Sequence, residues 1–356
     1  MLDVVFLILG LALLIKGADI FVSASVGIAK RLKIPTAIIG LTVVAMGTSA
    51  PEVVIGITAS VQGANALAIG NVVGSNIFNL LFIIGLCATI KTLRFNVHEL
   101  AKDFWLSIFA AILLLVFMIT GGEYISRWAS LIMLVMFIVY LTMLVRQVLK
   151  AQGVGEDGDF TQDTAGEGKD GFVHDIASKS KDDFAQDFAA TGNGEDDNTP
   201  GTASKHRPLA IIILLALLGC ALIIAGGQLA VDSATKIAAS LGITERIVGL
   251  TVVAIGTSLP ELITSLVACK KGENEFALGN IIGSSIFNIM FVLGIAGLIS
   301  PLQYERALIF DTTFLIIGSL IALVFVYTGK RLTRREGVIM VLMYVVYMAI
   351  IMFYSV

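Results

Sequence analysis

Two glutamates, Glu52 and Glu261, stand well inside long apolar stretches of the sequence, and a proline precedes each of them. A carboxylate at mid-membrane depth is costly unless it is paired or bound to a metal ion, so it is a functional candidate by default. A structural carboxylate that caps a helix break is the alternative. The two positions correspond in an internal repeat of the chain, which favours a shared functional role.

Further oxygen atoms surround each glutamate. The preceding proline has no N–H and so releases a backbone carbonyl one helical turn earlier, and the Gly-Thr-Ser residues at 47–49 and 256–258 make a local break easy. Freed carbonyls are tolerated in a membrane only where they line a cavity or bind something. Thr48 and Thr257 precede their glutamates by four residues and share a helical face with them. Hydroxyls, carbonyls and carboxylates together are the ligands that calcium prefers, whereas zinc and copper favour thiolate or imidazole.

Two polar trios follow in the next apolar stretches, each with i, i+4, i+8 spacing that makes one polar stripe along a helix. They are Asn71, Ser75 and Asn79, and Asn280, Ser284 and Asn288. We expect ion coordination from the serines and from Asn79 and Asn288. Hydrogen bonding between helices is the favoured role of the first asparagine of each trio. Small-residue pairs at Gly70 and Gly74, and at Gly279 and Gly283, predict close helix packing.

The composition places most of the chain in a membrane. Hydrophobic residues make up 57% of the sequence, charged residues only 14%, and the mean hydropathy is +0.92. A span needs about 20 mainly apolar residues. Ten candidates lie at 2–29, 38–61, 67–90, 103–121, 126–147, 208–235, 247–268, 275–298, 307–328 and 337–355. The N-terminus lacks a basic region and a small-residue cleavage site, so we expect the first segment to be retained.

Several functional classes are excluded or disfavoured. All three histidines lie outside the predicted spans, which excludes a histidine-ligated metal site within the membrane, and the three cysteines lie inside spans and imply no disulfide framework. Ser49 and Ser258 have no nearby histidine or lysine base, so an intramembrane hydrolase is poorly supported and we expect no enzyme. A channel is disfavoured because no acidic ring or filter loop is present.

Basic residues are distributed asymmetrically between the two ends of the predicted spans. Sixteen lysines and arginines near span ends fall on one side and four on the other, which places the first side in the cytoplasm. Both termini then lie outside the cytoplasm, and the loop 148–207 lies within it. Its segment 151–205 holds thirteen Asp or Glu and four Lys, a composition typical of disorder. A passive linker is the favoured role, with a degenerate calcium-binding loop at 157–168 or an amphipathic surface helix at 172–188 as alternatives.

The chain repeats itself. Residues 40–85 align without a gap on 249–294, an offset of 209, with 24 of 46 pairs identical. Each unit holds five spans, an odd number, so the second half enters the membrane from the opposite side. The predicted fold is therefore an all-α polytopic membrane protein of ten transmembrane helices in two inverted five-helix repeats, 1–147 and 208–356. Substrate sites of such transporters lie near mid-membrane where the repeats meet.

The motifs GTSAPE (47–52) with GSNIFN (74–79), and GTSLPE (256–261) with GSSIFN (283–288), resemble the two α-repeats of the sodium/calcium exchanger family. The resemblance covers essentially all ten predicted spans. It implies an antiporter that exchanges Ca²⁺ for Na⁺ by alternating access, with spans 2, 3, 7 and 8 forming the ion-binding core. It also implies that the long first and sixth spans are tilted and slide across that core.

The resemblance further implies a ligand set for the two ions. Its members are the Glu52 and Glu261 carboxylates, the hydroxyls of Thr48, Thr257, Ser75 and Ser284, and the carbonyls of Ala45 and Ala254, with Ser49 and Ser258 less firmly placed and Asn79 and Asn288 flanking the centre. In the potassium-dependent branch an aspartate occupies the position of Asn288, so asparagine tilts this chain towards potassium independence. Ca²⁺ and Na⁺ are then cargo, and no cofactor, nucleic acid or obligate protein partner is implied.

Two alternative functions remain open. A calcium/proton antiporter on the same fold is the main rival, because two glutamates can take protons instead of sodium, and an exchanger of magnesium or another divalent ion is a lesser one. The predicted location is the cell inner (plasma) membrane.

In the first span Lys16 and Asp19 predict a local ion pair or interfacial snorkelling, and their repeat counterparts, Ala225 and Gln228, carry no charge.

Overall fold

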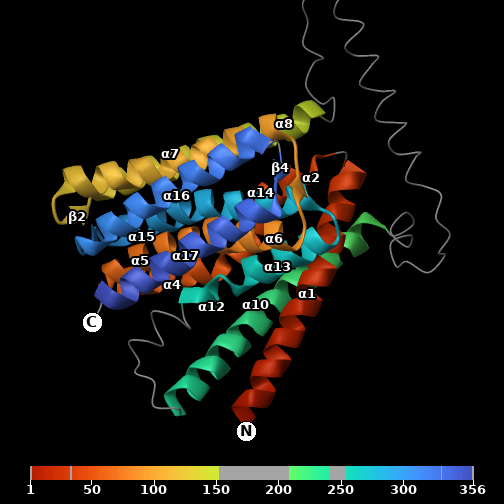
Figure 1. The fold of residues 1–356 in the computed structure, drawn as a ribbon, viewed down its shortest axis with the longest axis horizontal. Coiled ribbons are helices and arrows are strands. Elements are labelled where there is room, and N and C mark those ends of the chain that lie inside the picture. Colours follow the sequence, from red (N-terminus) through yellow and green to blue (C-terminus); the bar gives the residue numbers. More distant parts are fainter. Residues whose placement is uncertain (1, 33, 152–207, 241–253, 330, 355–356) are drawn as a thin grey trace, which may run out of the picture. The chain divides into compact units, whose positions relative to one another are not determined.

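Long helices dominate the computed structural model, which describes residues 2–32, 34–151, 208–240, 254–329 and 331–354 (Figure 1). Both repeats belong to one compact unit formed by 1–152 and 209–356. Residues 152–207 of the predicted loop lie outside the described residues, and so do the segments of its two alternative roles, 157–168 and 172–188. Within the described part, seven helices are long and apolar enough to cross a membrane, and a bent pair makes an eighth.

Six spans are continuous helices. They are α1 (Leu2–Leu32), α7 (Val97–Gly121), α8 (Arg127–Ala151), α10 (Leu209–Ser240), α16 (Ala307–Gly329) and α17 (Arg334–Tyr354). The expected unusual length of the first and sixth spans is confirmed, at 31 and 32 residues. Two bounds differ from prediction by five residues or more: α7 begins at 97 rather than 103 and α10 ends at 240 rather than 235. These helices continue past the apolar stretch that hydropathy detects.

The spans that carry the polar motifs are interrupted. The second span comprises α2 (Thr36–Ile39), the π-helix η1 (Gly40–Val44), α3 (Ala45–Thr48) and α4 (Ala50–Val61), and the third comprises α5 (Asn65–Ile77), the π-helix η2 (Phe78–Ile83) and α6 (Ile84–Ile90). Their counterparts are α12 (Ala254–Thr257) with α13 (Leu259–Lys270), and α14 (Asn274–Phe287), the π-helix η5 (Asn288–Val292) and α15 (Leu293–Ile299). The predicted start of the seventh span, at 247, lies outside the described residues.

The third and eighth spans form the centre of the unit. Within an 18-residue apolar stretch, 72% of residues are buried in the third span and 83% in the eighth, against 28% in α1 and in α10. Stacked phenylalanines brace both π-helices in equivalent ways, with Phe78 on Phe82 at 4.9 Å between ring centroids and Phe287 on Phe291 at 4.6 Å. The repeat therefore extends from the motifs into the packing around them.

Two short antiparallel ribbons join the repeats. The strand β1 (Leu93–Arg94) pairs with β4 (Arg331–Leu332), and β2 (Tyr124–Ile125) pairs with β3 (Leu302–Gln303). β1 and β3 are related by the same offset of 209 as the motifs. Each ribbon thus takes one strand from each half and ties the two halves together.

Four glycines allow α1 and α10 to lie side by side (Figure 1). A Cβ atom at Gly10 would lie 2.7 Å from the Ala230 nitrogen, and one at Gly226 would lie 2.6 Å from the Leu14 nitrogen. Gly17 and Gly219 are equally close to the opposite backbone. The offset of 209 relates Gly10 to Gly219 and Gly17 to Gly226, so the contact surrounds the pseudo-twofold axis of the repeats.

The predicted glycine packing of the motif helices is confirmed in only one repeat. A Cβ atom at Gly279 would lie 2.5 Å from the Ala37 oxygen, and one at Gly283 would lie 2.6 Å from the Leu41 oxygen. At Gly74 such an atom would meet nothing within 4 Å among the described residues, and at Gly70 it would make only an ordinary contact. The counterparts of Ala37 and Leu41, at 246 and 250, lie outside the described residues, so close packing at Gly70 and Gly74 stays a prediction.

The α1–α10 contact predicts a stability effect. Gly226→Ala places a methyl group against the backbone of α1, and we expect it to lower the free energy of unfolding by about 1–3 kcal/mol, as overpacking does. Thermal unfolding of the detergent-solubilised protein measures this. Gly121→Ala is the matched control, since a Cβ atom there would meet nothing within 4 Å of the described residues. Equal unfolding temperatures for Gly226→Ala and Gly121→Ala would contradict the packing argument.

Candidate cation site

Both glutamates follow a break in their span. Helix α3 ends before Ser49, whose φ and ψ are −82° and 12°, and Ser258 has nearly the same values, −89° and 5°. In the second span the helical axis bends by 48° at this point. The prolines that follow cannot continue the preceding helix, because they lack an N–H, and each lies in the first turn of the next helix, where none is needed. The predicted breaks are confirmed.

The break places Glu52 in the first turn of α4 and Glu261 in the first turn of α13. The N-terminal end of a helix carries partial positive charge, so it stabilises a carboxylate at this position. Both side chains are fully buried, with 0% exposure. The two carboxylates also lie close enough to act on each other electrostatically.

Each carboxylate is held mainly by the opposite repeat. Glu261 Oε1 accepts a hydrogen bond from Ser49 Oγ at 2.8 Å, and the Thr48 hydroxyl also interacts with it. Glu52 Oε1 accepts one from Ser258 Oγ at 3.4 Å, and the Thr257 hydroxyl also interacts with it. The Thr-Ser pair of one break thus faces the glutamate of the other, which sequence separation could not show.

The third and eighth spans complete the contacts. Ser75 Oγ donates to Glu52 Oε1 at 3.4 Å, and Ser284 interacts with Glu261 and donates to the Ala45 carbonyl at 3.4 Å. The Ala45 carbonyl also accepts from the Ser49 N–H at 3.0 Å. The second repeat differs here, because the Ser258 N–H donates to Ile255 rather than to Ala254. The structure thus gathers both glutamates and the predicted hydroxyls, with the Ala45 carbonyl beside Ser284.

Among the predicted ligands, four buried oxygens have no hydrogen-bond donor in the described part of the chain. They are Glu52 Oε2, Glu261 Oε2, Asn79 Oδ1 and Asn288 Oδ1. A buried acceptor without a partner costs about 1–3 kcal/mol, and more when it is charged. Neither glutamate forms a salt bridge with a described side chain. Buried carboxylate and amide oxygens that face no donor are suited to a cation, and hard cations such as calcium take oxygen ligands of this kind.

The first asparagine of each trio supports a threonine. Thr48 Oγ1 lies 3.1 Å from Asn280 Oδ1, and Thr257 Oγ1 lies 3.3 Å from Asn71 Oδ1, so both contacts cross between repeats. The Val44 and Ala45 carbonyls also lie within reach of the Thr48 hydroxyl, at 3.1 and 3.3 Å, so its one proton has several acceptors and its lone pairs are left for a cation. The favoured role of these asparagines, hydrogen bonding between helices, agrees with the contacts.

Three further polar residues near the site were not anticipated. Asn76 Nδ2 donates to the Ser285 carbonyl at 3.2 Å, and Asn288 Nδ2 lies 3.5 Å from Asn76 Oδ1. Asn76 and Ser285 are repeat counterparts, so they meet at the pseudo-twofold axis. Ser265 accepts from Asn280 Nδ2 at 3.0 Å. Asn76 and Ser285 could have been found from the sequence, because they are polar residues within the GSN and GSS motifs. No comparable sequence signal marks Ser265.

Known proteins resemble this chain over most of its length. The family model described as sodium/calcium exchanger protein matches residues 2–146 and 211–353. The sodium/calcium exchanger MaX1 of Methanosarcina acetivorans is 36% identical, with 98% of this chain and 97% of that protein covered. The inner membrane protein YrbG of Escherichia coli is 31% identical, with 100% and 98% covered. The solved structure of the sodium-calcium exchanger NCX_Mj superposes with a TM-score of 0.73 at 29% identity, covering 98% of each chain. The predicted ten-helix fold of inverted repeats is thereby confirmed.

The unpartnered oxygens predict cation-dependent stability. Because a ligand that binds only the folded state stabilises it, we expect Ca²⁺ to raise the unfolding temperature of the purified protein. Glu52→Gln and Glu261→Gln remove one negative charge each and should abolish most of this shift. Glu123→Gln, at an exposed position in the described structure, should leave it unchanged. A shift of equal size in all four proteins would place the Ca²⁺ site elsewhere.

Proposed function

The chain belongs to the sodium/calcium exchanger family, a family of calcium/cation antiporters, and from this premise we propose that it exchanges Ca²⁺ for Na⁺ by alternating access. The observation that supports this most directly is the pair of buried carboxylates, Glu52 and Glu261, each with one oxygen that no described donor reaches. Named relatives and the NCX_Mj structure concern sodium and calcium, which favours these ions as cargo.

The proposed ligands are the oxygens that converge on the two glutamates. Around the carboxylates we place the hydroxyls of Thr48, Thr257, Ser75 and Ser284 and the carbonyls of Ala45 and Ala254, with Ser49 and Ser258 as further hydroxyls and Asn79 and Asn288 flanking the centre. Calcium takes six to eight oxygens, so this set is large enough to replace its water shell. A smaller subset of the same oxygens suits each sodium ion.

The two carboxylate charges couple the movement of Ca²⁺ to the movement of Na⁺. One Ca²⁺ neutralises Glu52 and Glu261, and so does a set of Na⁺ ions, whereas the empty site is a buried dianion. Carrying uncompensated charge through a low-dielectric environment is expensive. A loaded site therefore changes sides far more readily than an empty one. This difference makes exchange obligatory and suppresses leak of either ion.

Asn288 bears on the choice of a third ion. Its side chain is fully buried and its Oδ1 has no described donor. An amide at this position adds a neutral ligand rather than a third negative charge. The core then holds two carboxylates, and no additional monovalent cation is needed to balance the site. Potassium-independent exchange is the proposed mode.

The orientation follows from the basic residues. The chain is a multi-span membrane protein, and we place it in the cell inner (plasma) membrane with the lysine- and arginine-rich ends in the cytoplasm. Gly272 and its neighbours Lys270 and Lys271 then lie on the cytoplasmic side. Both termini lie on the opposite side, and the loop 148–207 lies in the cytoplasm.

A flux experiment tests the exchange. Proteoliposomes loaded with Na⁺ and diluted into Na⁺-free buffer should accumulate radioactive Ca²⁺, at the same rate with and without K⁺. We expect Glu261→Gln to abolish uptake, because one remaining carboxylate cannot neutralise Ca²⁺, and Glu123→Gln to retain it.

The same proteoliposomes distinguish sodium coupling from proton coupling. A calcium/proton antiporter would take up Ca²⁺ in response to a pH gradient without any Na⁺ gradient, since two protons also neutralise two carboxylates. Uptake that follows the pH gradient and ignores Na⁺ would overturn the proposed function. Uptake that requires K⁺ would overturn the role assigned to Asn288.

A further inference from the structure

The helices α1 and α10 contact the rest of the unit unequally. They pack on each other over much of their length, and α1 also packs extensively against α13. By repeat symmetry the equivalent contact would join α10 to α4, but in the described part of the chain no comparable contact exists. Among the described residues, the α1–α10 pair is therefore held against α13 at one end of the ion-binding core and lacks the equivalent contact with α4 at the other end.

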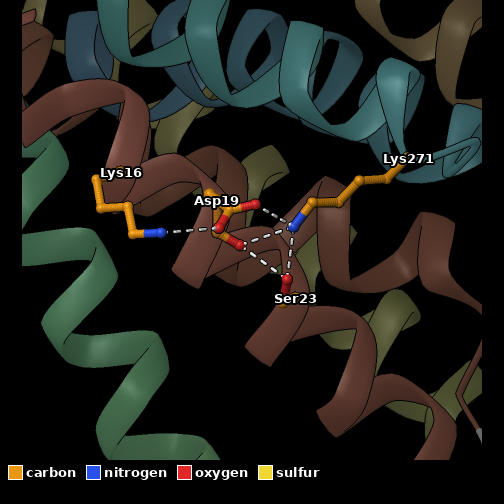
Figure 2. Close-up of polar contacts among 4 residues, drawn as sticks. All are labelled: Lys16, Asp19, Ser23 and Lys271. Atoms are coloured by element: carbon orange, nitrogen blue, oxygen red, sulfur yellow. Dashed lines mark hydrogen bonds and ion pairs between the residues drawn. The ribbon is translucent and has the colours of Figure 1, made fainter. Parts of the chain in front are cut away.

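A cluster of charged and polar groups joins α1 to α13 at this contact (Figure 2). Lys271 Nζ lies 2.7 Å from Asp19 Oδ1, and it donates to the Asp19 carbonyl at 2.9 Å and to Ser23 Oγ at 2.6 Å. Ser23 Oγ also donates to the Asp19 carbonyl at 2.8 Å. The predicted pair of Lys16 with Asp19 is present at 3.7 Å, but Lys271 is the nearer cation.

A second ion pair lies farther along α1. Lys30 Nζ is 3.8 Å from Glu273 Oε1, and Glu273 is the residue before α14. Lys271 and Glu273 flank Gly272, whose φ of +83° favours glycine and makes the tight turn between α13 and α14. The turn thus offers one positive and one negative side chain, and each has its opposite charge on α1.

The other repeat lacks these charges. The counterparts of Asp19 and Lys271 are Gln228 and Gln62, and those of Lys30 and Glu273 are Ala239 and Ala64. Ser23 corresponds to Asp232, but with Gln62 in place of Lys271 that aspartate would face no equivalent cation. The ion-binding residues are nearly symmetric between the repeats, whereas the residues of this contact form two ion pairs in one repeat and have no equivalent cation in the other.

We propose that the Asp19–Ser23–Lys271 cluster and the Lys30–Glu273 pair form a latch that biases transport towards one access state. The inference rests on the proposed alternating access, in which inverted repeats exchange their arrangements. The mirrored state would bring α10 onto α4 and set Gln228 towards Gln62, without ion pairs. The latch thus stabilises the state in which α1 closes the core at its cytoplasmic end and the site opens to the outside.

The size of the bias follows from the surroundings of the latch. The side chains of Lys271 and Asp19 are 31% and 46% exposed, so solvent screens their attraction in part. Pairs of this kind change an equilibrium by about twofold to fivefold. Asp19 also lies within a membrane helix, where an unpaired carboxylate is unfavourable, and Lys16 compensates for Lys271 only partly at its longer distance.

The test compares the two faces of the membrane. Apparent affinity scales with the fraction of protein in the competent state, so the outer-to-cytoplasmic ratio of Ca²⁺ half-saturation reports the access equilibrium directly. In oriented vesicles we expect Lys271→Gln and Asp19→Asn to raise this ratio by about twofold to fivefold. Lys270→Gln is the matched control, because this adjacent exposed lysine forms no ion pair with a described residue, and it should leave the ratio unchanged.

A mirrored latch should act in the same direction as loss of the native one. Gln62→Lys combined with Gln228→Asp installs the missing charges in the other repeat, stabilises the state open to the cytoplasm, and should raise the ratio by a similar factor. A purely structural defect would weaken Ca²⁺ transport at both faces and leave the ratio constant. An unchanged ratio in Lys271→Gln, or a fall in the mirrored variant, would overturn the latch.

A distance measurement separates failure of the latch from failure of the proposed function. Spin labels at Val61 on α4 and Lys236 on α10, both exposed, report the approach of α10 to α4 in a chain whose three cysteines have been replaced. Lys271→Gln should increase the weight of short distances by the same twofold to fivefold. This readout needs no ion flux. If Lys271→Gln leaves the spin-label distances unchanged, the latch is overturned, even when Na⁺-driven Ca²⁺ uptake is present. If Ca²⁺ uptake is absent, the proposed function is overturned, even when the distances change.

Discussion

The structure depends on keeping two carboxylates buried side by side without a cationic side chain. Glu52 and Glu261 are fully buried, and no described lysine or arginine neutralises them. The helix breaks at Ser49 and Ser258 follow from this constraint, since they supply two helix N-termini and free hydroxyls at the right depth. The stabilisation these groups provide is partial, and the remaining cost is what makes a cation bind.

In the inverted repeat, each half supplies hydrogen-bonding groups to the site residues of the other half. Each glutamate receives hydroxyls from the opposite break, and each threonine is oriented by an asparagine of the opposite half. Neither half can therefore form the site alone. The ribbons β1–β4 and β2–β3 and the glycine contact of α1 with α10 also join the two halves. Docking of the repeats and formation of the site are one event.

Much of this was predictable because it is periodic. The length of the apolar stretches predicts the spans, and the prolines predict the helix breaks. The constant offset of 209 predicts the repeat and the gathering of both glutamates with their hydroxyls. The pairing of Ser49 with Glu261 rather than Glu52 was not predictable, because it depends on how the halves dock. The same holds for Ser265 behind Asn280 and for Lys271 on Asp19. Such contacts join positions that neither periodicity nor repeat equivalence relates.

Symmetry and its violation have separate energetic roles. A binding site built from equivalent residues presents nearly the same ligands to either side, so by itself it gives the two access states similar energies. Any preference must then come from contacts that one state makes and the other lacks. The charges at Asp19 and Lys271, with glutamines at both equivalent positions, are such a contact. Because they lie outside the ligand set, they can set the preferred side of the membrane without changing how an ion is held.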